Sequence, residues 1–314
     1  MGLLTSHLHF RQLEYIQQIA KEGSISKAAA KLYISQSALS QQLLKLEDEI
    51  GAPLFERGLN PLRPTHLGEQ YLEYVGKILF EYEQANRLLE DLEHNKKSRL
   101  TIGIPTNRST QVLPYFIPAF LRDYPHIELN FREHPSWRLD EMILEGEIDF
   151  SMMISAPEAP QITFLPMIRD EIFLGCQSGS PLDLRLKETG RLMEPSLLKG
   201  ENFIMMKKGY RLYNEAEHLF ESSGIRPNVI LMTGNVDLSH RLAAMGTGAC
   251  LISRLAHELN PLDQELSCYS IGETGLFWTL GINYHKGKYI SWAMRLFFDR
   301  LRECLREHFP KEVL

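Results

Sequence analysis

Features of secreted and membrane proteins are scarce in this sequence. Its 314 residues include only four cysteines, Cys176, Cys250, Cys268 and Cys304, and no two are close enough in the chain to suggest a zinc site or a dithiol motif. The N-terminal segment lacks the apolar core of a signal peptide, and no later run approaches the roughly 18 apolar residues of a membrane-spanning helix. We expect a soluble cytoplasmic protein with buried, reduced thiols; a redox-sensing cysteine pair is the alternative.

Motifs that carry catalysis are also missing. The sequence has no nucleophile elbow and no glycine-rich phosphate loop, and its eleven histidines show no metal-binding spacing. Asp149, in the segment EGEIDF, ends a turn between a helix and a strand and is interpreted as structural rather than as a catalytic acid. We predict that the protein is not an enzyme and holds no cofactor or metal. An enzyme that binds a small molecule stays open as an alternative.

A strongly basic segment is likewise absent. Residues 1–66 carry seven Lys and Arg against six Asp and Glu, while the whole chain has a formal net charge of −6. Any affinity for nucleic acid must therefore come from the local placement of charge, and pairing of two copies would double the contacts.

Three helical patterns occupy the first part of the chain. Apolar residues from Phe10 to Ala20 recur on one helical face, and Gly23 ends that helix. Ser24 is the expected N-cap of a second helix and Ser35 that of a third, whose buried face comprises Leu39, Leu43, Leu46 and Ile50. The short connection between the last two helices predicts a helix-turn-helix.

The opposite face of the third helix is polar but nearly uncharged. Hydroxyls and amides approach base edges closely in the major groove and bond phosphates without desolvating a full charge. An ordinary surface helix with capping serines is the alternative for this face taken alone. The next segment, GAPLFERGLNPLRPTHLG, predicts two short extended pieces around a turn, with Arg57 and Arg63 on either side, as in a wing that lies along the phosphate backbone.

The run GSISKAAAKLYISQSALSQQLLKLEDEIGAPLFERGLNPLRPTHLG resembles the winged helix-turn-helix of the LysR-type transcriptional regulators. It has the family's GS-AA-L, SQ-S-S-Q-LE, G-LF-R and T-x-x-G landmarks in order and spacing. It departs from the family at His66-Leu67, where an apolar-Ala pair is usual, and at Gln41, where a basic residue is frequent. The residues expected to contact DNA are Ser35, Gln36, Ser37, Ser40, Gln41, Lys45, Arg57, Arg63 and Thr65.

A long helix without a breaking proline is expected from about residue 65 to residue 94, followed by a polar hinge, HNKKSR. Its apolar residues occupy the a and d positions of about three heptads, with charges outside this seam. Such a helix predicts pairing with a second copy of the chain. The expected dimerisation residues are Tyr71, Val75, Ile78, Tyr82, Ala85, Leu89 and Leu92.

Beyond the hinge, strand and helix patterns alternate, which predicts βαβ units on a largely parallel sheet. The expected strands are 100–104, 127–133, 148–155, 171–176, 203–206, 228–233, 248–253 and 276–284, and the expected helices are 112–123, 137–145, 212–223, 238–245 and 290–306. Two α/β lobes of this kind resemble the effector domain of the same family, which is similar to the periplasmic-binding-protein fold of bacterial solute-binding proteins.

Ligands of open α/β sheets bind beyond the carboxyl ends of the strands, which directs attention to the segment PTNRST after the first strand. We expect Asn107, Ser109 and Thr110 to cap the next helix, whose free N–H groups form an anion site that Arg108 reinforces. Plain capping beside a solvated arginine is the alternative. The resemblance implies further effector contacts from Ser136, Tyr210, Arg211 and the turn Thr233-Gly234-Asn235. Arg108 and Arg211, with Asn235 where many relatives carry an acid, favour an anionic effector.

The sequence patterns and the resemblance to this family together predict an α/β transcription factor in three parts. These are a winged helix-turn-helix rich in α-helix (1–65), a dimerisation helix with its hinge (66–98) and a two-lobed effector-binding domain (99–314), with lobe I at about 99–169 and 275–314 and lobe II at about 170–274. The expected partners are double-stranded promoter DNA, a small-molecule effector, further copies in a dimer or dimer of dimers, and RNA polymerase, without a membrane. A redox-responsive regulator and a ligand-independent architectural DNA-binding protein are the alternatives.

Overall fold

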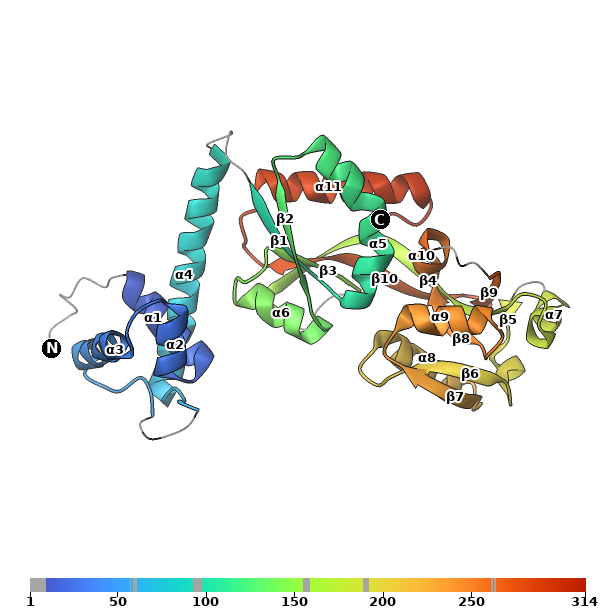
Figure 1. Cartoon of the computed structure of the whole chain (residues 1–314), viewed down its shortest axis with the longest axis horizontal. Coiled ribbons are helices and arrows are strands. Elements are labelled where there is room, and N and C mark those ends of the chain that lie inside the picture. Colours follow the sequence, from blue (N-terminus) through green and yellow to red (C-terminus); the bar gives the residue numbers. More distant parts are fainter. Residues whose placement is uncertain are drawn as a thin grey trace. The chain divides into compact units, whose positions relative to one another are not determined.

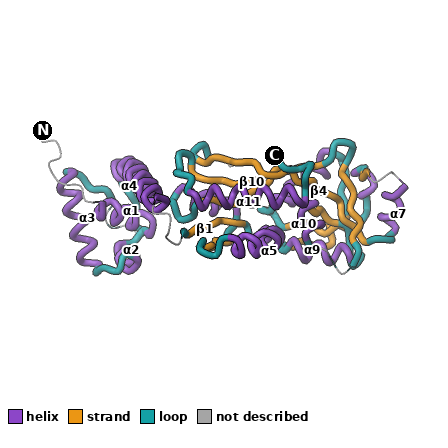
Figure 2. Tube along the Cα trace, turned by 90° about the horizontal axis from the view of Figure 1, so that it is seen from above, coloured by secondary structure: helices purple, strands orange, loops and turns teal. Residues whose placement is uncertain are grey.

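The computed structural model describes residues 10–56, 58, 61–92, 98–154, 159–188, 192–260, 262 and 264–314. The chain forms two compact units, residues 1–94 and 95–314. The described part of the first unit is almost wholly helical, whereas the second mixes strands and helices (Figure 2). No described helix is both long and apolar enough to span a membrane.

The described part of the first unit contains four helices: α1 (Phe10–Glu22), α2 (Ile25–Lys31), α3 (Gln36–Ile50) and α4 (His66–Leu92) (Figure 1). Both expected N-caps are confirmed, because Ser24 accepts a hydrogen bond from the Lys27 N–H and Ser35 accepts one from the Ala38 N–H. Gly23 ends α1 at a φ of +57°, and an added Cβ would lie 2.9 Å from the Cβ of Pro61, so conformation and close packing both favour glycine. The apolar faces of the helices meet in one core.

A short antiparallel bridge between Phe55 and Pro64 forms the base of the wing. The N–H of Glu56 donates to the carbonyl of Arg63 at 2.8 Å, which confirms the two extended pieces. The buried carboxylate of Glu47, on α3, accepts hydrogen bonds from the N–H groups of Leu54 (2.7 Å) and Phe55 (3.3 Å). The wing is therefore tied to α3 by a buried side chain.

Lobe I of the second unit is built on three parallel strands, β1 (Arg99–Ile104), β2 (Glu128–Glu133) and β3 (Phe150–Ile154). Helices α5 (Thr106–Asp123) and α11 (Trp292–His308) cover one face of this sheet, and α6 (Ser136–Leu144) covers the other (Figure 1). Aromatic residues of α5, β3 and α11 pack in the core between the layers. This arrangement places the starts of α5 and α6 beyond the carboxyl ends of β1 and β2.

Two long antiparallel strands, β4 (Ile162–Gln177) and β10 (Leu276–His285), run from lobe I into lobe II. Strands β8 (Cys250–Ser253) and β9 (Leu266–Ile271) pair with β4 in antiparallel fashion, and β5 (Leu192–Met193) pairs with β9 in parallel. The sheet order is β2-β1-β3-β10-β4-β9-β5, with β8 also on β4. The expectation of a largely parallel sheet was wrong for this region because its long crossover strands are not joined by βαβ units.

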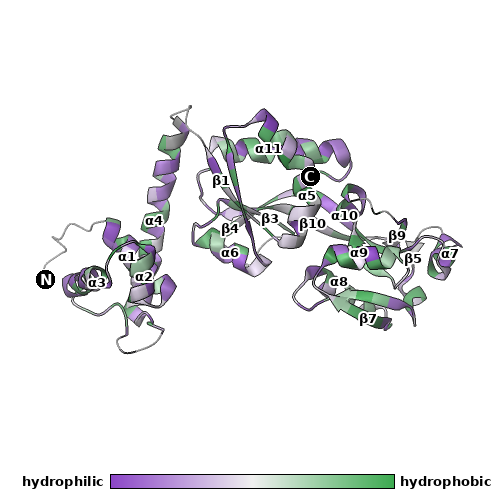
Figure 3. Cartoon of the chain, viewed as in Figure 1, coloured by the Kyte–Doolittle hydropathy of each residue, from purple (hydrophilic) through white to green (hydrophobic). Residues whose placement is uncertain are grey.

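Lobe II is completed by the parallel strands β6 (Asn202–Met206) and β7 (Asn228–Thr233). Its helices are α7 (Pro181–Glu188), the 3-10 turn η1 (Pro195–Leu198), α8 (Arg211–Ser222), α9 (Val236–Ala244) and α10 (Arg254–Leu259). Four successive apolar side chains of β7, Val229 to Met232, are each at least 36% exposed, and most of the strand has hydrophobic colouring in Figure 3.

Candidate functional site

The exposed face of α3 consists mainly of neutral polar side chains. Ser35, Gln36, Ser37 and Gln41 are exposed, and Ser40 is half-buried. Lys45, also exposed, lies 4.0 Å from Glu49, a surface pair that is weak in water. These groups are open to solvent, so any contact they make with another molecule replaces contacts with water.

The expected contacts on the wing have different environments. Arg63 is exposed, whereas Arg57 lies outside the described residues. The Thr65 hydroxyl donates to the carbonyl of Pro53 at 2.9 Å and accepts a hydrogen bond from the N–H of Gly68 at 3.0 Å. Thr65 therefore caps α4 and fixes the wing to it. A Cβ on Gly68 would lie 1.9 Å from the Leu54 carbonyl oxygen, so this junction requires glycine.

The surface of α4 requires a correction to the predicted dimer seam. Val75 is only 1% exposed and belongs to the core of its own unit, so it is not available to a second copy; Tyr71 is partly buried against the same core. Ile78, Tyr82, Ala85 and Leu89 are exposed, and the side chain of Leu92 is outside the described residues. The sequence analysis missed two further apolar side chains, Tyr74 (65% exposed) and Leu88 (43%). The exposed apolar stripe on α4 thus comprises Tyr74, Ile78, Tyr82, Ala85, Leu88 and Leu89.

Helix α5 begins earlier than predicted, which changes the role of the segment PTNRST. The N-cap is Pro105, without a side-chain hydrogen bond, and Thr106 is the first helical residue. The expectation that Asn107, Ser109 and Thr110 cap the helix was therefore wrong, because all three lie within its first turns. The side chain of Asn107 is outside the described residues, and Thr110 is exposed.

A cleft of about 1050 Å³ is lined by residues of both lobes. It brings together four of the predicted effector residues, Arg108, Ser136, Tyr210 and Arg211. Three other described members of that set are engaged away from the lining. Ser109 contacts the Thr106 carbonyl and the Glu133 carboxylate, Thr233 accepts a hydrogen bond from the Asn235 N–H, and Asn235 caps α9 through the Leu238 N–H. Gly234 packs against the Tyr210 hydroxyl, because an added Cβ would lie 2.8 Å from it.

Arg108 is the most buried cation on the cleft wall, with 7% of its surface exposed. Its guanidinium carbon lies 5.3 Å from the centroid of the Trp278 ring, and its Nη1 lies 3.9 Å from Oδ2 of Asp170. Among the described residues, Nη1 has no hydrogen-bond partner. Asp170 is better satisfied, because it accepts hydrogen bonds from Trp278 Nε1 (2.6 Å) and the Leu255 N–H (3.0 Å).

Arg108 has a counter-charge in Asp170, but its Nη1 lacks a hydrogen-bond acceptor among the described residues. Burial lowers the pKa of Arg108 and raises the pKa of Asp170, and the attraction between them opposes both shifts. Arginine side chains are not deprotonated in proteins, so the guanidinium of Arg108 keeps its charge. A ligand oxygen at Nη1 would supply a charge-assisted hydrogen bond that the protein does not provide.

Several cleft residues were missed by the sequence analysis. They are His134, Trp137, Asp140, Lys208, Trp278 and Asn283. Trp137 is 67% exposed, and Met152, Met153 and Ile154 add further apolar surface beside it. A polar residue within an apolar strand pattern, such as Asn283 in LFWTLGINY, could have indicated a position in the cleft. The cleft therefore combines an apolar wall with a few polar groups, as ligand sites commonly do.

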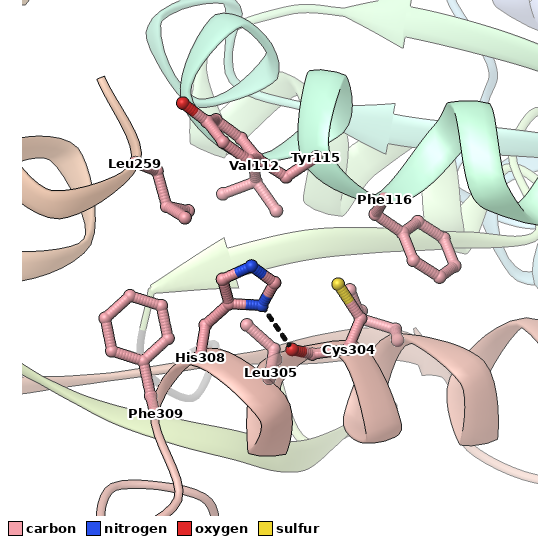
Figure 4. Close-up of a pocket in the computed structure, with 9 residues that line it drawn as sticks. Val112, Tyr115, Phe116, Leu259, Cys304, Leu305, His308 and Phe309 are labelled. Atoms are coloured by element: carbon pink, nitrogen blue, oxygen red, sulfur yellow. Dashed lines mark hydrogen bonds between the residues drawn. The ribbon is translucent and has the colours of Figure 1, made fainter. Parts of the chain in front are cut away.

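A second pocket, between α5, α10 and α11, is too small for a ligand. Its volume is about 10 Å³, roughly the space of one water molecule. Figure 4 shows Val112, Tyr115 and Phe116 from α5 around it, with Nδ1 of His308 hydrogen-bonded at 2.9 Å to the carbonyl oxygen of Cys304. We assign it a packing role.

The cysteines lie in environments that suppress thiolate formation. All four are free. Burial raises the pKa of Cys176 to about 11 and that of Cys268 to about 12, and it also raises the pKa values of Cys250 and Cys304. Thiols of this kind are poor nucleophiles at neutral pH. Within the described ranges, no group of three His, Cys, Asp or Glu residues is arranged to hold a metal ion.

Comparison with known proteins assigns both units to one family. The model "LysR substrate binding domain" matches residues 93–306, and "Bacterial regulatory helix-turn-helix protein, lysR family" matches residues 10–69. Two Bacillus subtilis transcriptional regulators are similar over nearly their whole length: YybE is 28% identical over 90% of this chain and 94% of its own, and YcgK is 26% identical over 98% of both. A full-length OxyR variant of Pseudomonas aeruginosa has the same fold, with a TM-score of 0.68 and 19% identity over 96% of this chain and 95% of OxyR. The chain belongs to the LysR family of transcriptional regulators, with a helix-turn-helix domain followed by an effector-binding domain.

Proposed function

We propose that this regulator senses a small organic anion, of the carboxylate class, in the cleft between its lobes. The observation that carries this proposal is that Arg108, a buried residue of the cleft lining, has an Nη1 atom without a hydrogen-bond partner among the described residues. Unsatisfied buried donors are unfavourable, and an anionic oxygen satisfies this one.

The rest of the cleft agrees with an anion that has an apolar body. Lys208 and Arg211 approach from lobe II, and only one carboxylate, that of Asp140, is among the described lining residues. Arg211 is 45% exposed and lies 3.5 Å from Glu215 on its own helix, so we assign it a weaker role than Arg108. The aromatic surface of Trp137 and Trp278 provides contacts for an apolar group.

Ligand binding between the lobes would favour one arrangement of the effector domain over others. A ligand shifts such an equilibrium only by its differential affinity for the states. We propose that this shift changes the placement of the DNA-binding domains in a cytoplasmic oligomer, and that RNA polymerase responds to it. Contacts with double-stranded operator DNA are assigned to the exposed polar residues of α3, to the half-buried Ser40 and, on the wing, to Arg63.

The exposed apolar stripe on α4 is proposed as the main self-association surface. Ile78 is 41% exposed and Leu89 is 61% exposed, an arrangement that a second α4 would bury. The exposed edge strand β7 is a second candidate surface for contact between copies.

A redox-responsive function is disfavoured by the cysteine environments. Several solved structures of similar fold are OxyR proteins, but their identity to this chain is at most 22% in those compared. Cysteines that sense oxidants need thiolate character and exposure, whereas Cys176 and Cys250 are each no more than 2% exposed and have raised pKa values.

The test is a thermal-shift screen of the full-length protein with small carboxylates, followed by calorimetry. We expect Arg108→Ala to weaken the best carboxylate by about 10-fold to 100-fold, since a hydrogen bond to a charged group contributes about 1.5–3 kcal/mol. Arg122→Ala is the matched control, because Arg122 lies on the same helix with its side chain 77% exposed. An uncharged ligand, or a carboxylate whose affinity ignores Arg108→Ala, would refute the anion site.

A further inference from the structure

A second polar cluster lies on the lobe I side of the cleft, on the face of the sheet that α6 covers. Its members are Asp140 on α6, Ser151 on β3 and Asn283 on β10. Ser151 and Asn283 are direct cross-strand partners, so their side chains share this face. Asp140 and Asn283 line the cleft, and Nδ2 of Asn283 donates to Oδ1 of Asp140 at 3.3 Å.

This hydrogen bond fixes the orientation of the Asn283 amide. A carboxylate only accepts hydrogen bonds, so the amide N–H must face Asp140 and the amide oxygen must point elsewhere. That oxygen has no hydrogen-bond donor among the described residues, and the Ser151 hydroxyl has no hydrogen-bond partner among them either. Both residues are almost fully buried, with 1% and 0% of their surfaces exposed.

Asp140 adds a negative charge without a matching cation. Within the described residues no Lys or Arg forms an ion pair with it, and burial raises its pKa while the Asn283 N–H opposes that shift. The neighbouring acid on α6, Glu141, is paired with Arg138 at 3.0 Å. The cluster therefore contains an amide oxygen without a donor and a carboxylate without a counter-charge among the described residues.

We propose that the effector is dipolar: its carboxylate binds at Arg108, and an ammonium or hydroxyl group on the same molecule donates hydrogen bonds to Asp140 and the Asn283 amide oxygen. This assignment rests on the anion site proposed above and narrows its ligand to the amino-acid and hydroxy-acid class. An ammonium donates to both acceptors at once and compensates the charge of Asp140. A plain carboxylate leaves the Asn283 oxygen without a donor and Asp140 without a counter-charge.

The test uses the full-length protein and matched probes with phenyl, isobutyl and methyl side chains. Each set contains the α-amino acid, the 2-hydroxy acid, the carboxylate that lacks both groups, and the amine that lacks the carboxylate. Dissociation constants are measured by calorimetry for wild type, Asp140→Asn and Asn283→Leu. Asp140→Asn retains an acceptor for the Asn283 N–H, so it removes the charge without breaking that bond. Glu141→Gln is the control on the same helix.

We expect one amino or hydroxy acid to bind at least about tenfold more tightly than its plain carboxylate, and both cleft variants to abolish that preference. The affinity of the plain carboxylate should change less than about threefold, and Glu141→Gln should behave as wild type. Equal affinity of the donor-bearing and plain carboxylates overturns the dipolar assignment and leaves the anion site standing. Binding of the amines without the carboxylates overturns the anion site itself, and the absence of binding by every probe overturns both.

Discussion

On α3 most side chains assigned to DNA are exposed in the free protein, whereas Arg108 and Asn283 on the cleft wall, and Asp170 beside Arg108, are almost excluded from water. The polar groups of α3 are satisfied by solvent and by local caps. Those of the cleft depend on one another, and some atoms of Arg108 and Asn283 remain unmatched among the described residues.

The difference teaches that the two surfaces respond differently to substitution. Replacing a hydrated side chain changes what the protein binds and leaves its folding nearly unchanged. Replacing one member of a buried network also alters the free energy of unfolding, because the remaining members lose a partner that water cannot replace. The following substitutions test this contrast, in order of expected effect.

The exposed apolar stripe on α4 should give the largest effect. Its side chains are exposed in a single chain, and we propose that a second copy buries them. Ile78→Asp with Leu89→Asp should dissociate the oligomer, because two charges without partners would be buried at the contact, each costing several kcal/mol. Light scattering measures the mass, and DNA affinity should fall with it. Lys77→Asp places a negative charge at an exposed site that is already charged, and it should leave the mass unchanged. An unchanged mass for the double variant would move the main interface to the effector domain.

Asp170→Ala should produce the largest loss of stability in the effector domain. It leaves the guanidinium of Arg108 buried without its counter-charge and removes the acceptor of Trp278 Nε1, and breaking a buried pair in this way costs about 3–5 kcal/mol. Thermal and denaturant unfolding measure the change. Asp123→Ala removes a surface partner of Arg300 and should cost less than about 0.5 kcal/mol. Similar losses for the two variants would contradict the contrast.

The same contrast explains what could be predicted from the sequence. The caps at Ser24 and Ser35 and the apolar face of α3 follow from local periodicity, and the structure confirms them. The start of α5 could not be predicted from local periodicity. Thr106 and Ser109 favour turns by intrinsic propensity, but they are helical here because Val112 and Phe116, farther along the helix, are held in the sheet core.

The cleft was only partly predictable because its networks join distant segments. The Asn283–Asp140 hydrogen bond spans 143 positions, and no local pattern indicates such a pairing. Heptad spacing also could not reveal that Val75 packs into its own unit, since the period identifies an apolar face but not its partner. A regular spacing predicts which residues share an apolar surface. The partners in a buried hydrogen-bond network are known only once the fold is known.

A buried histidine, His240, should make the stability of the effector domain depend on pH. Burial lowers the pKa of His240 from 6.5 to about 4, with His257 adding to the effect and a backbone hydrogen bond opposing it. Below pH 6.5 the unfolded chain takes up a proton that the folded chain refuses, so stability is lost as the pH falls from about 6.5 to 4. The loss is at most about 3 kcal/mol. His240→Gln should flatten the unfolding profile in this range, whereas substitution of the exposed His218 by Gln should not. An unchanged slope in His240→Gln would show that other groups govern it.

Substitutions on α3 should change recognition without changing stability. We expect Gln36→Ala and Ser40→Ala to reduce the preference for the cognate site by about 1–3 kcal/mol, because they remove base contacts. Arg63→Ala should weaken specific and random DNA alike, because it removes a phosphate contact. Competition binding at fixed salt separates the two effects. Equal losses on both DNAs for the α3 variants would refute the assignment of base contacts to this helix.

Ser35 sharpens the comparison because it is exposed and also structural. Its hydroxyl accepts a hydrogen bond from the Ala38 N–H at 3.2 Å, so Ser35→Ala should lower the free energy of unfolding by about 1 kcal/mol. Ser35→Asp restores a capping acceptor at a helix N-terminus and should recover that stability, yet it places a negative charge on the face assigned to DNA. Unfolding and DNA titrations should therefore rank the two variants in opposite orders. Ser35→Asp should be the more stable variant and the weaker DNA binder, and Ser35→Ala the less stable variant and the stronger DNA binder. If Ser35→Asp binds DNA as tightly as Ser35→Ala, this serine caps α3 without lying near the phosphates.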